Sequence, residues 1–156
     1  MKIFNENKKI DIVYGNIKYF NHKTNKLTGR QFKPGPYSKG SYLKGWHAPH
    51  TAFFVTKKCY EKFGNFRRDI KVSPDFEIMF RFQELNNLES IYLNDTITIM
   101  GIGGNSGNLK NIIVGNYYVI KSLLIHNQKI FIPLFLYRRL MPKIIYKLLS
   151  FLKIIK

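Results

Sequence analysis

Three segments of the chain have a pattern of apolar and polar positions that predicts β-strands. Residues 11–20, 51–56 and 90–102 are rich in β-branched and aromatic residues and alternate in part between apolar and polar side chains. Such runs are typical of strands, and Gly15 predicts a bend in the first of them. Residues 21–45 mix Gly and Pro with many polar residues. They predict a loop that contains at most one short hairpin.

Helical patterns occupy three other segments. Residues 57–63 predict a short helix that ends at a glycine, and residues 111–126 predict a longer one. Ser73 and Pro74 are typical of an N-cap and a first helical position, so a helix is expected from residue 75 to about residue 85. Apolar residues cover most of its circumference, which predicts a helix buried on several sides.

The tail after residue 129 has a different pattern. From residue 143 onward its polar residues recur at spacings of four, three and three, which places them on one stripe of an otherwise apolar helix. This basic amphipathic helix is expected to lie on an anionic membrane surface, where each basic residue contributes about 1 kcal/mol. The alternative is a helix packed on the domain core or on a partner subunit. The residues expected at the membrane surface are Arg138, Arg139, Lys143, Lys147 and Lys153.

Composition and charge restrict the class of protein. With 156 residues and 45% hydrophobic residues, the chain suits one globular domain and not a disordered linker. The net charge is +17, and the segment after Asp95 contains nine basic residues and no acidic residue. This excess suits nucleic acid or an anionic lipid surface, although a drift in composition also explains part of it. Cys59 is the only cysteine, which favours a reducing compartment.

Few motifs for catalysis or cofactor binding are present. The sequence has no P-loop, dinucleotide-binding fingerprint, paired-cysteine metal motif or nucleophile elbow. His47 and His50 could bind a metal together with Asp75, but two histidines that form hydrogen bonds in a polar loop explain them more simply, and no metal ligand is assigned. In the first turn of its helix, Asp75 is expected to stay ionised and able to accept a proton. The alternative role is to stabilise the start of the helix.

Four blocks in order resemble family-2 glycosyltransferases, which are inverting enzymes with a GT-A fold that build bacterial surface polysaccharides. DIVYGNIKYF (11–20) is similar to the strand that follows the metal-binding aspartates in that family. HAPHTAFFVTKKCYEKFGNF (47–66) and SPDFEIMFRF (73–82) resemble its acceptor-side segment and the start of the following helix. GIGGNSGN (101–108) is similar to a Gly-Gly-x-Ser element near the end of the catalytic domain.

The resemblance implies a role for several residues. Asp75 would be the general base that takes the proton from the acceptor hydroxyl, and Glu77, two positions further along, is the weaker candidate. A divalent metal, Mg or Mn, and a nucleotide-sugar donor are implied, but their ligands have no counterpart in this chain. The residues expected to bind substrate are Trp46, His47, His50, Gly103 and Gly104.

The expected fold is therefore α/β, a partial GT-A domain without the N-terminal nucleotide-binding half. Residues 1–110 would form the acceptor-side half, and residues 111–156 a basic helical tail at the membrane. The expected function is sugar transfer to a polysaccharide or lipid-linked acceptor at the cytoplasmic face of the cell membrane. The chain would be one product of a split or frameshifted gene, a fragment completed by a second chain, or a degenerate remnant. The alternatives are a basic nucleic-acid-binding module, which no known motif supports, and a non-catalytic membrane-associated subunit.

Overall fold

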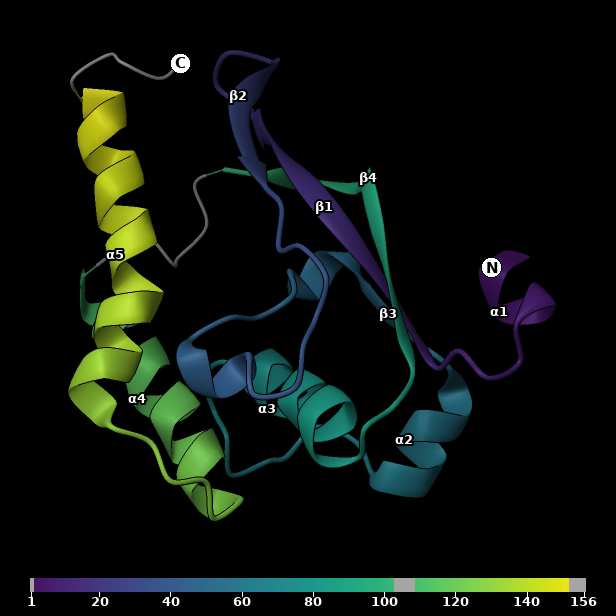
Figure 1. The fold of residues 1–156 in the computed structure, drawn as a ribbon. Helices are drawn as coiled ribbons and strands as arrows, with labels where there is room; N and C mark the ends of the chain where they lie inside the picture. The colour runs from purple at the N-terminus through teal and green to yellow at the C-terminus, as the bar shows by residue number, and fades with distance from the viewer. Residues whose placement is uncertain (1, 103–108, 152–156) are drawn as a thin grey trace.

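The protein has a mixed α/β fold built on a four-stranded sheet (Figure 1). The structure is a computed structural model that describes residues 2–102 and 109–151. Its elements are α1 (Lys2–Glu6), β1 (Ile12–Asn21), β2 (Lys26–Phe32), η1 (Tyr42–Lys44), η2 (His50–Ala52), β3 (Phe53–Val55), α2 (Lys57–Phe63), α3 (Pro74–Phe80), η3 (Arg81–Leu85), β4 (Ser90–Gly101), α4 (Leu109–Ile125) and α5 (Ile132–Phe151).

The sheet is organised around β1. Parallel pairing with β4 runs along one edge of β1, while β3 and then β2 pair antiparallel along its other edge. The first six residues of β1 are all buried. This burial explains why the most continuously apolar strand of the sequence occupies the centre of the sheet.

The predicted bend at Gly15 appears as a change of register between β1 and β4. Gly15 pairs with Leu93 but the next residue, Asn16, pairs with Thr96, so β4 bulges at this point. A Cβ atom on Gly15 would lie 2.9 Å from Ile97 Cδ1, and a larger residue would not fit there. Inside the bulge the Tyr92 hydroxyl donates to Asn16 Oδ1 at 2.6 Å, which satisfies a buried amide.

Helix α3 is buried on several sides, as its apolar pattern predicts. Phe76 and Phe80 lie in the main core, and the helix continues through the π-turn η3 to Leu85. Ser73 stands at the predicted N-cap position and Pro74 at the start of the helix, but the cap has an unusual form. Ser73 adopts a left-handed conformation with φ 57° and its side chain makes no capping hydrogen bond; its carbonyl accepts the Phe76 N–H at 3.1 Å instead.

Two other predicted segments can be compared directly. Helix α2 has the predicted bounds, and Gly64 ends it with φ 86°. The region 21–45 is more ordered than expected, because residues 26–32 form the strand β2 and complete a hairpin with β1. The weak apolar alternation of β2 hid this strand, since its residues are mostly exposed.

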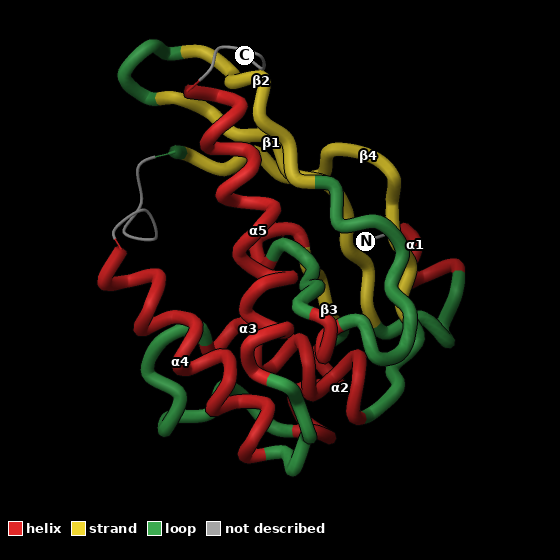
Figure 2. The backbone as a smooth tube through the Cα atoms, turned by 60° about the vertical axis from the view of Figure 1, so that its left-hand side comes forward, coloured by secondary structure: helices red, strands yellow, loops and turns green. Residues whose placement is uncertain are grey.

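Helices α4 and α5 pack against the same core as the sheet. Val119 and Leu123 of α4 and Phe135 of α5 are fully buried and belong to one cluster with Tyr14 and Phe80. Both helices lie on the side of α3 away from α1 and α2, and they come forward in Figure 2. One core therefore includes residues from both sides of the boundary expected at residue 110.

No helix in the described ranges has the length and apolar character needed to cross a bilayer.

Candidate functional site

The candidate site forms where η2 meets the start of α3. Asp75 lies in the first turn of α3, and its Oδ2 atom is 3.2 Å from Nδ1 of His50 in η2. The side chain of His50 is 56% exposed and that of Asp75 is 36% exposed. The sequence-predicted base and one predicted acceptor-site residue are thus brought together, and solvent still reaches the carboxylate.

Arg139 of α5 completes this site from the other side. Burial lowers its pKa to about 10, and the charge of Asp75 opposes that shift. Its Nε donates to Asn116 Oδ1 of α4 at 3.2 Å, and its guanidinium lies 5.0 Å from the ring centre of Phe76. Its Nη1 atom is buried and has no hydrogen-bond partner within the described ranges.

The placement of Arg139 corrects the prediction that it lies at a membrane surface. It contacts α3 and α4, whereas its neighbour Arg138 is exposed. Adjacent residues of a helix point about 100° apart, and in α5 this turn directs Arg139 toward α3 and α4 while Arg138 is directed outward. The side chains of Lys143 and Lys147 lie outside the described part of the structure, as does Lys153 entirely.

The candidate site consists of the Asp75 carboxylate with His50 on one side and Arg139 near the start of the same helix. His50 Nδ1 is close enough to form a hydrogen bond with the Asp75 carboxylate, and the Arg139 guanidinium lies over the ring of Phe76, the next residue of α3. A partly exposed carboxylate can accept a proton from a hydroxyl that approaches from solvent. His50 is the more exposed of the two side chains.

Trp46 and His47 make contacts within the domain, and their binding of acceptor stays a prediction. The Trp46 indole N–H donates to the Pro34 carbonyl at 2.7 Å, and its ring packs edge-on against Tyr42 at 5.1 Å in the core. His47 Nδ1 lies 2.9 Å from the Ala48 carbonyl, and its ring is 5.5 Å from that of Phe32 in β2. Trp46 therefore packs against the main core.

The second candidate base, Glu77, is fully buried in an ion-paired network. Arg81 donates to both of its carboxylate oxygens, at 2.9 and 3.1 Å, and His126 Nε2 lies 2.8 Å from Oε1. The Arg81 guanidinium also bonds the Phe63 and Gly64 carbonyls, which ties α3 to the end of α2. Glu77 is therefore a structural residue, and Asp75 is the carboxylate of α3 that solvent reaches.

Two cavities lie away from this cluster. One, of about 410 Å³, is lined by Asp11, Lys58, Cys59, Glu61, Lys62, Phe63 and Leu88. The other, of about 260 Å³, is lined by Tyr37, Lys39, Gln83, Asn87, Leu88, Glu89 and Ser90. Neither is lined by Asp75, so a substrate site at this residue would not use these cavities. The predicted substrate-binding residues Gly103 and Gly104 lie outside the described residues.

Metal and thiol chemistry find no support in this part of the chain. Within residues 2–102 and 109–151, no three His, Cys, Asp or Glu side chains come together in a way that could hold a metal ion. The metal that the resemblance implies therefore has no ligand set among them. Burial raises the pKa of the Cys59 thiol and outweighs the lowering by the Thr56 hydrogen bond and by the charge of Lys58.

No family model, curated protein or solved structure matches this chain. The likeness to family-2 glycosyltransferases therefore rests on the four sequence blocks.

The structure adds two residues that the sequence reasoning missed. Asn116 and Arg139 come from α4 and α5, 41 and 64 positions after Asp75 in the chain. The position of Arg139 one residue after Arg138 gave only a weak signal that the two side chains point in different directions. Nothing in the local sequence of Asn116 indicates its contact.

Proposed function

We propose that this chain forms the acceptor-side part of an inverting glycosyltransferase, which moves a sugar from a nucleotide-sugar donor to a polysaccharide or lipid-linked acceptor. One observation carries the proposal. Asp75, the residue that the resemblance implies as general base, is a partly exposed carboxylate 3.2 Å from His50, a residue of the implied acceptor site. The neighbouring carboxylate of Glu77 is fully buried and ion-paired.

The proposed reaction is a direct displacement. The acceptor hydroxyl attacks the anomeric carbon, its proton passes to Asp75, and the nucleoside diphosphate leaves from the opposite face, so the configuration is inverted. His50 orients the carboxylate and provides a path for the proton to solvent. The implied metal would neutralise the diphosphate, and no residue described here is assigned to it.

The unpaired edge of β4 supports the proposal that a further polypeptide segment is needed to complete the sheet. β4 is twelve residues long and pairs with β1 on one edge; in the described structure no strand pairs with the other. An unpaired edge of this length is a template for another strand. The proposed donor-binding half, supplied by a second chain or by preceding residues, would pair here.

A reconstitution experiment tests the proposal. The chain is assayed with a panel of nucleotide sugars and glycan or lipid-linked acceptors, alone and joined to the polypeptide encoded directly upstream of it. We expect transfer with inversion from the joined protein and none from the chain alone. Failure of the joined protein to transfer or bind any nucleotide sugar would overturn the proposal. Salt-sensitive binding of DNA or RNA by the same preparation would favour the nucleic-acid alternative.

A further inference from the structure

Helices α4 and α5 carry an unusual share of the exposed apolar side chains. Sixteen large hydrophobic residues are exposed in the described structure, and ten of them lie between residues 113 and 148. Phe131 is 72% exposed, and Tyr117 and Tyr137 are each 60% exposed. We define the outer face as the nine exposed residues Ile113, Tyr117, Leu124, Phe131, Leu134, Tyr137, Ile144, Ile145 and Leu148.

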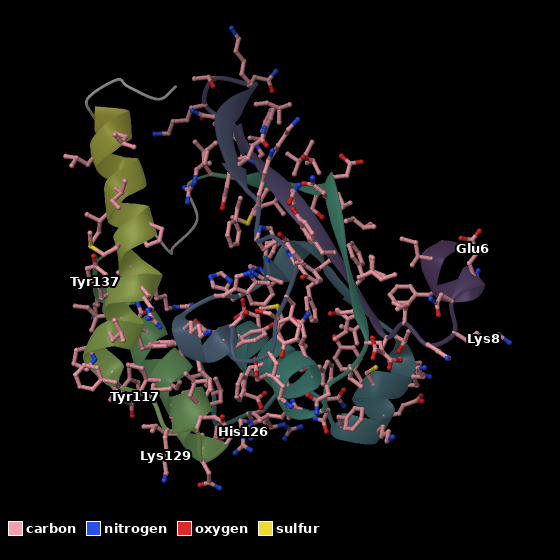
Figure 3. The ribbon with its side chains drawn as sticks, viewed as in Figure 1. Glu6, Lys8, Tyr117, His126, Lys129 and Tyr137 are labelled. Carbon is pink, nitrogen blue, oxygen red and sulfur yellow. The ribbon has the colours of Figure 1, made fainter. Side chains whose placement is uncertain are left out.

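The outer face is continuous along each helix. Residues 134, 137, 144, 145 and 148 fall within about 100° of each other around α5, and residues 113, 117 and 124 fall within about 40° around α4. The opposite side of α5 holds Phe135 and Arg139, which contact the core and α3. Figure 3 shows Tyr117 and Tyr137 extending from the same side of the molecule, away from the sheet.

The charged residues of α4, α5 and the loop between them are all basic. Lys129 and Arg138 are exposed beside it, and the chain has no acidic residue after Asp95. An apolar surface bordered by cations fits an anionic lipid bilayer, in which apolar groups enter the acyl boundary and cations meet phosphates. Tyrosine is suited to the depth between these two layers, because its ring is apolar and its hydroxyl is polar.

Other occupants fit less well. In a symmetric dimer the same face meets itself, so the cations of one copy would oppose those of the other without any acid to pair with. Nucleic acid would use the aromatic rings for stacking, but six of the nine residues are Ile or Leu, which do not stack on bases.

We propose that the outer face of α4 and α5 docks the protein on an anionic bilayer surface. This surface differs from the one predicted from sequence, because it includes α4 and the first half of α5 and excludes Arg139. It does not depend on the proposed sugar transfer, since binding to vesicles is measured without substrate.

Vesicle flotation tests this proposal. Binding of the full chain to phosphatidylcholine vesicles is compared with binding to phosphatidylcholine vesicles that contain phosphatidylglycerol. We expect binding to the anionic vesicles that weakens as salt is raised, and at least about tenfold weaker partition into neutral vesicles. The triple variant Tyr117→Ser, Phe131→Ser, Tyr137→Ser should reduce partition at least about tenfold, because three apolar side chains no longer enter the bilayer.

A matched control distinguishes binding through the outer face from nonspecific binding by exposed apolar side chains. The triple variant Leu27→Ser, Phe54→Ser, Phe66→Ser removes three side chains of similar exposure, 53%, 48% and 52%, outside this face. It should bind vesicles like the unaltered chain, and circular dichroism should show both variants folded. Equal losses in the two triples, or no binding to anionic vesicles, would overturn the proposal. The proposal would also be overturned if the chain formed a dimer or an oligonucleotide complex that only the Tyr117, Phe131 and Tyr137 triple variant dissociates.

Discussion

At the scale of residues, the fold is held by buried polar groups whose partners come from distant parts of the chain. Glu77 is fully buried, yet both of its oxygens are bonded, to Arg81 four residues later and to His126 at the end of α4. Each partner compensates the cost of burying the carboxylate. Removal of the negative charge would leave the Arg81 guanidinium, only 12% exposed, without its counterion.

Glu77→Gln is therefore expected to destabilise the protein by about 3 kcal/mol or more, as measured by urea unfolding. The matched control is Glu61→Gln. Glu61 pairs with Lys57 at 3.2 Å with the same i,i+4 spacing, but both side chains are largely exposed. Its loss should change the free energy of unfolding by no more than about 0.5 kcal/mol. Similar values for the two variants would contradict the role given to Glu77.

Buried tyrosines predict a loss of stability at alkaline pH. Burial raises the pKa of Tyr14 from 10.0 to about 12, and burial also raises the pKa of Tyr37 and of Tyr42. Between pH 10 and pH 12 the unfolded chain loses these protons while the folded chain keeps them. The unfolded state is then favoured, so the free energy of unfolding falls as pH rises through this window.

Tyr14→Phe should make this alkaline loss smaller by about 2 kcal/mol. At neutral pH the same variant should be less stable by about 1–3 kcal/mol, because the Tyr14 hydroxyl accepts the Tyr37 N–H at 2.6 Å and donates to the Gly35 carbonyl. Urea unfolding at a series of pH values measures both effects. An unchanged alkaline slope would show that Tyr14 titrates alike in both states.

At the scale of elements, the packing of α5 depends on a glycine in the preceding loop. Gly45 follows η1 with φ 90°, and a Cβ atom at this position would lie 3.2 Å from the Arg139 backbone nitrogen and Cβ. α5 can therefore approach η1 only because this residue has no side chain.

Gly45→Ala should cost at least about 1 kcal/mol more stability than Gly40→Ala. Gly40 has a similar φ of 85°, but a Cβ atom there would meet nothing within 4 Å, so its variant measures the backbone strain alone. Chemical unfolding gives the two values, and limited proteolysis should show α5 cut faster only in Gly45→Ala. Equal costs would mean that α5 does not depend on this close approach.

At the scale of the whole molecule, the sequence predicted the local elements better than their assembly. Strands β1 and β4 and helices α2, α3 and α4 follow from apolar periodicity and from local signals such as Gly64 and Pro74. β2 was missed because its exposed residues alternate weakly. The bulge at Gly15 was anticipated as a bend, but its partner in β4 depends on strand pairing that no local pattern encodes.

The candidate site was predicted only in part for the same reason. Asp75 and His50 are 25 positions apart and their proximity was implied by the resemblance, whereas Trp46 is a core residue. Arg139 is brought beside the start of α3, and is bonded to Asn116, through the packing of α4 and α5 on α3, which composition and spacing do not reveal. Tertiary packing thus assigns to the site an arginine that the sequence pattern had placed at a membrane.

The central claim is that Asp75 accepts the proton of the acceptor hydroxyl. The most direct test is the single-turnover rate of sugar transfer by the joined protein, with Asp75→Asn compared with Asp69→Asn, an exposed carboxylate paired to Arg67 at 3.0 Å. The account predicts that Asp75→Asn slows transfer by about a hundredfold or more, with nucleotide-sugar binding unchanged, and that Asp69→Asn has no effect. Transfer at an undiminished rate by the folded Asp75→Asn variant would contradict it.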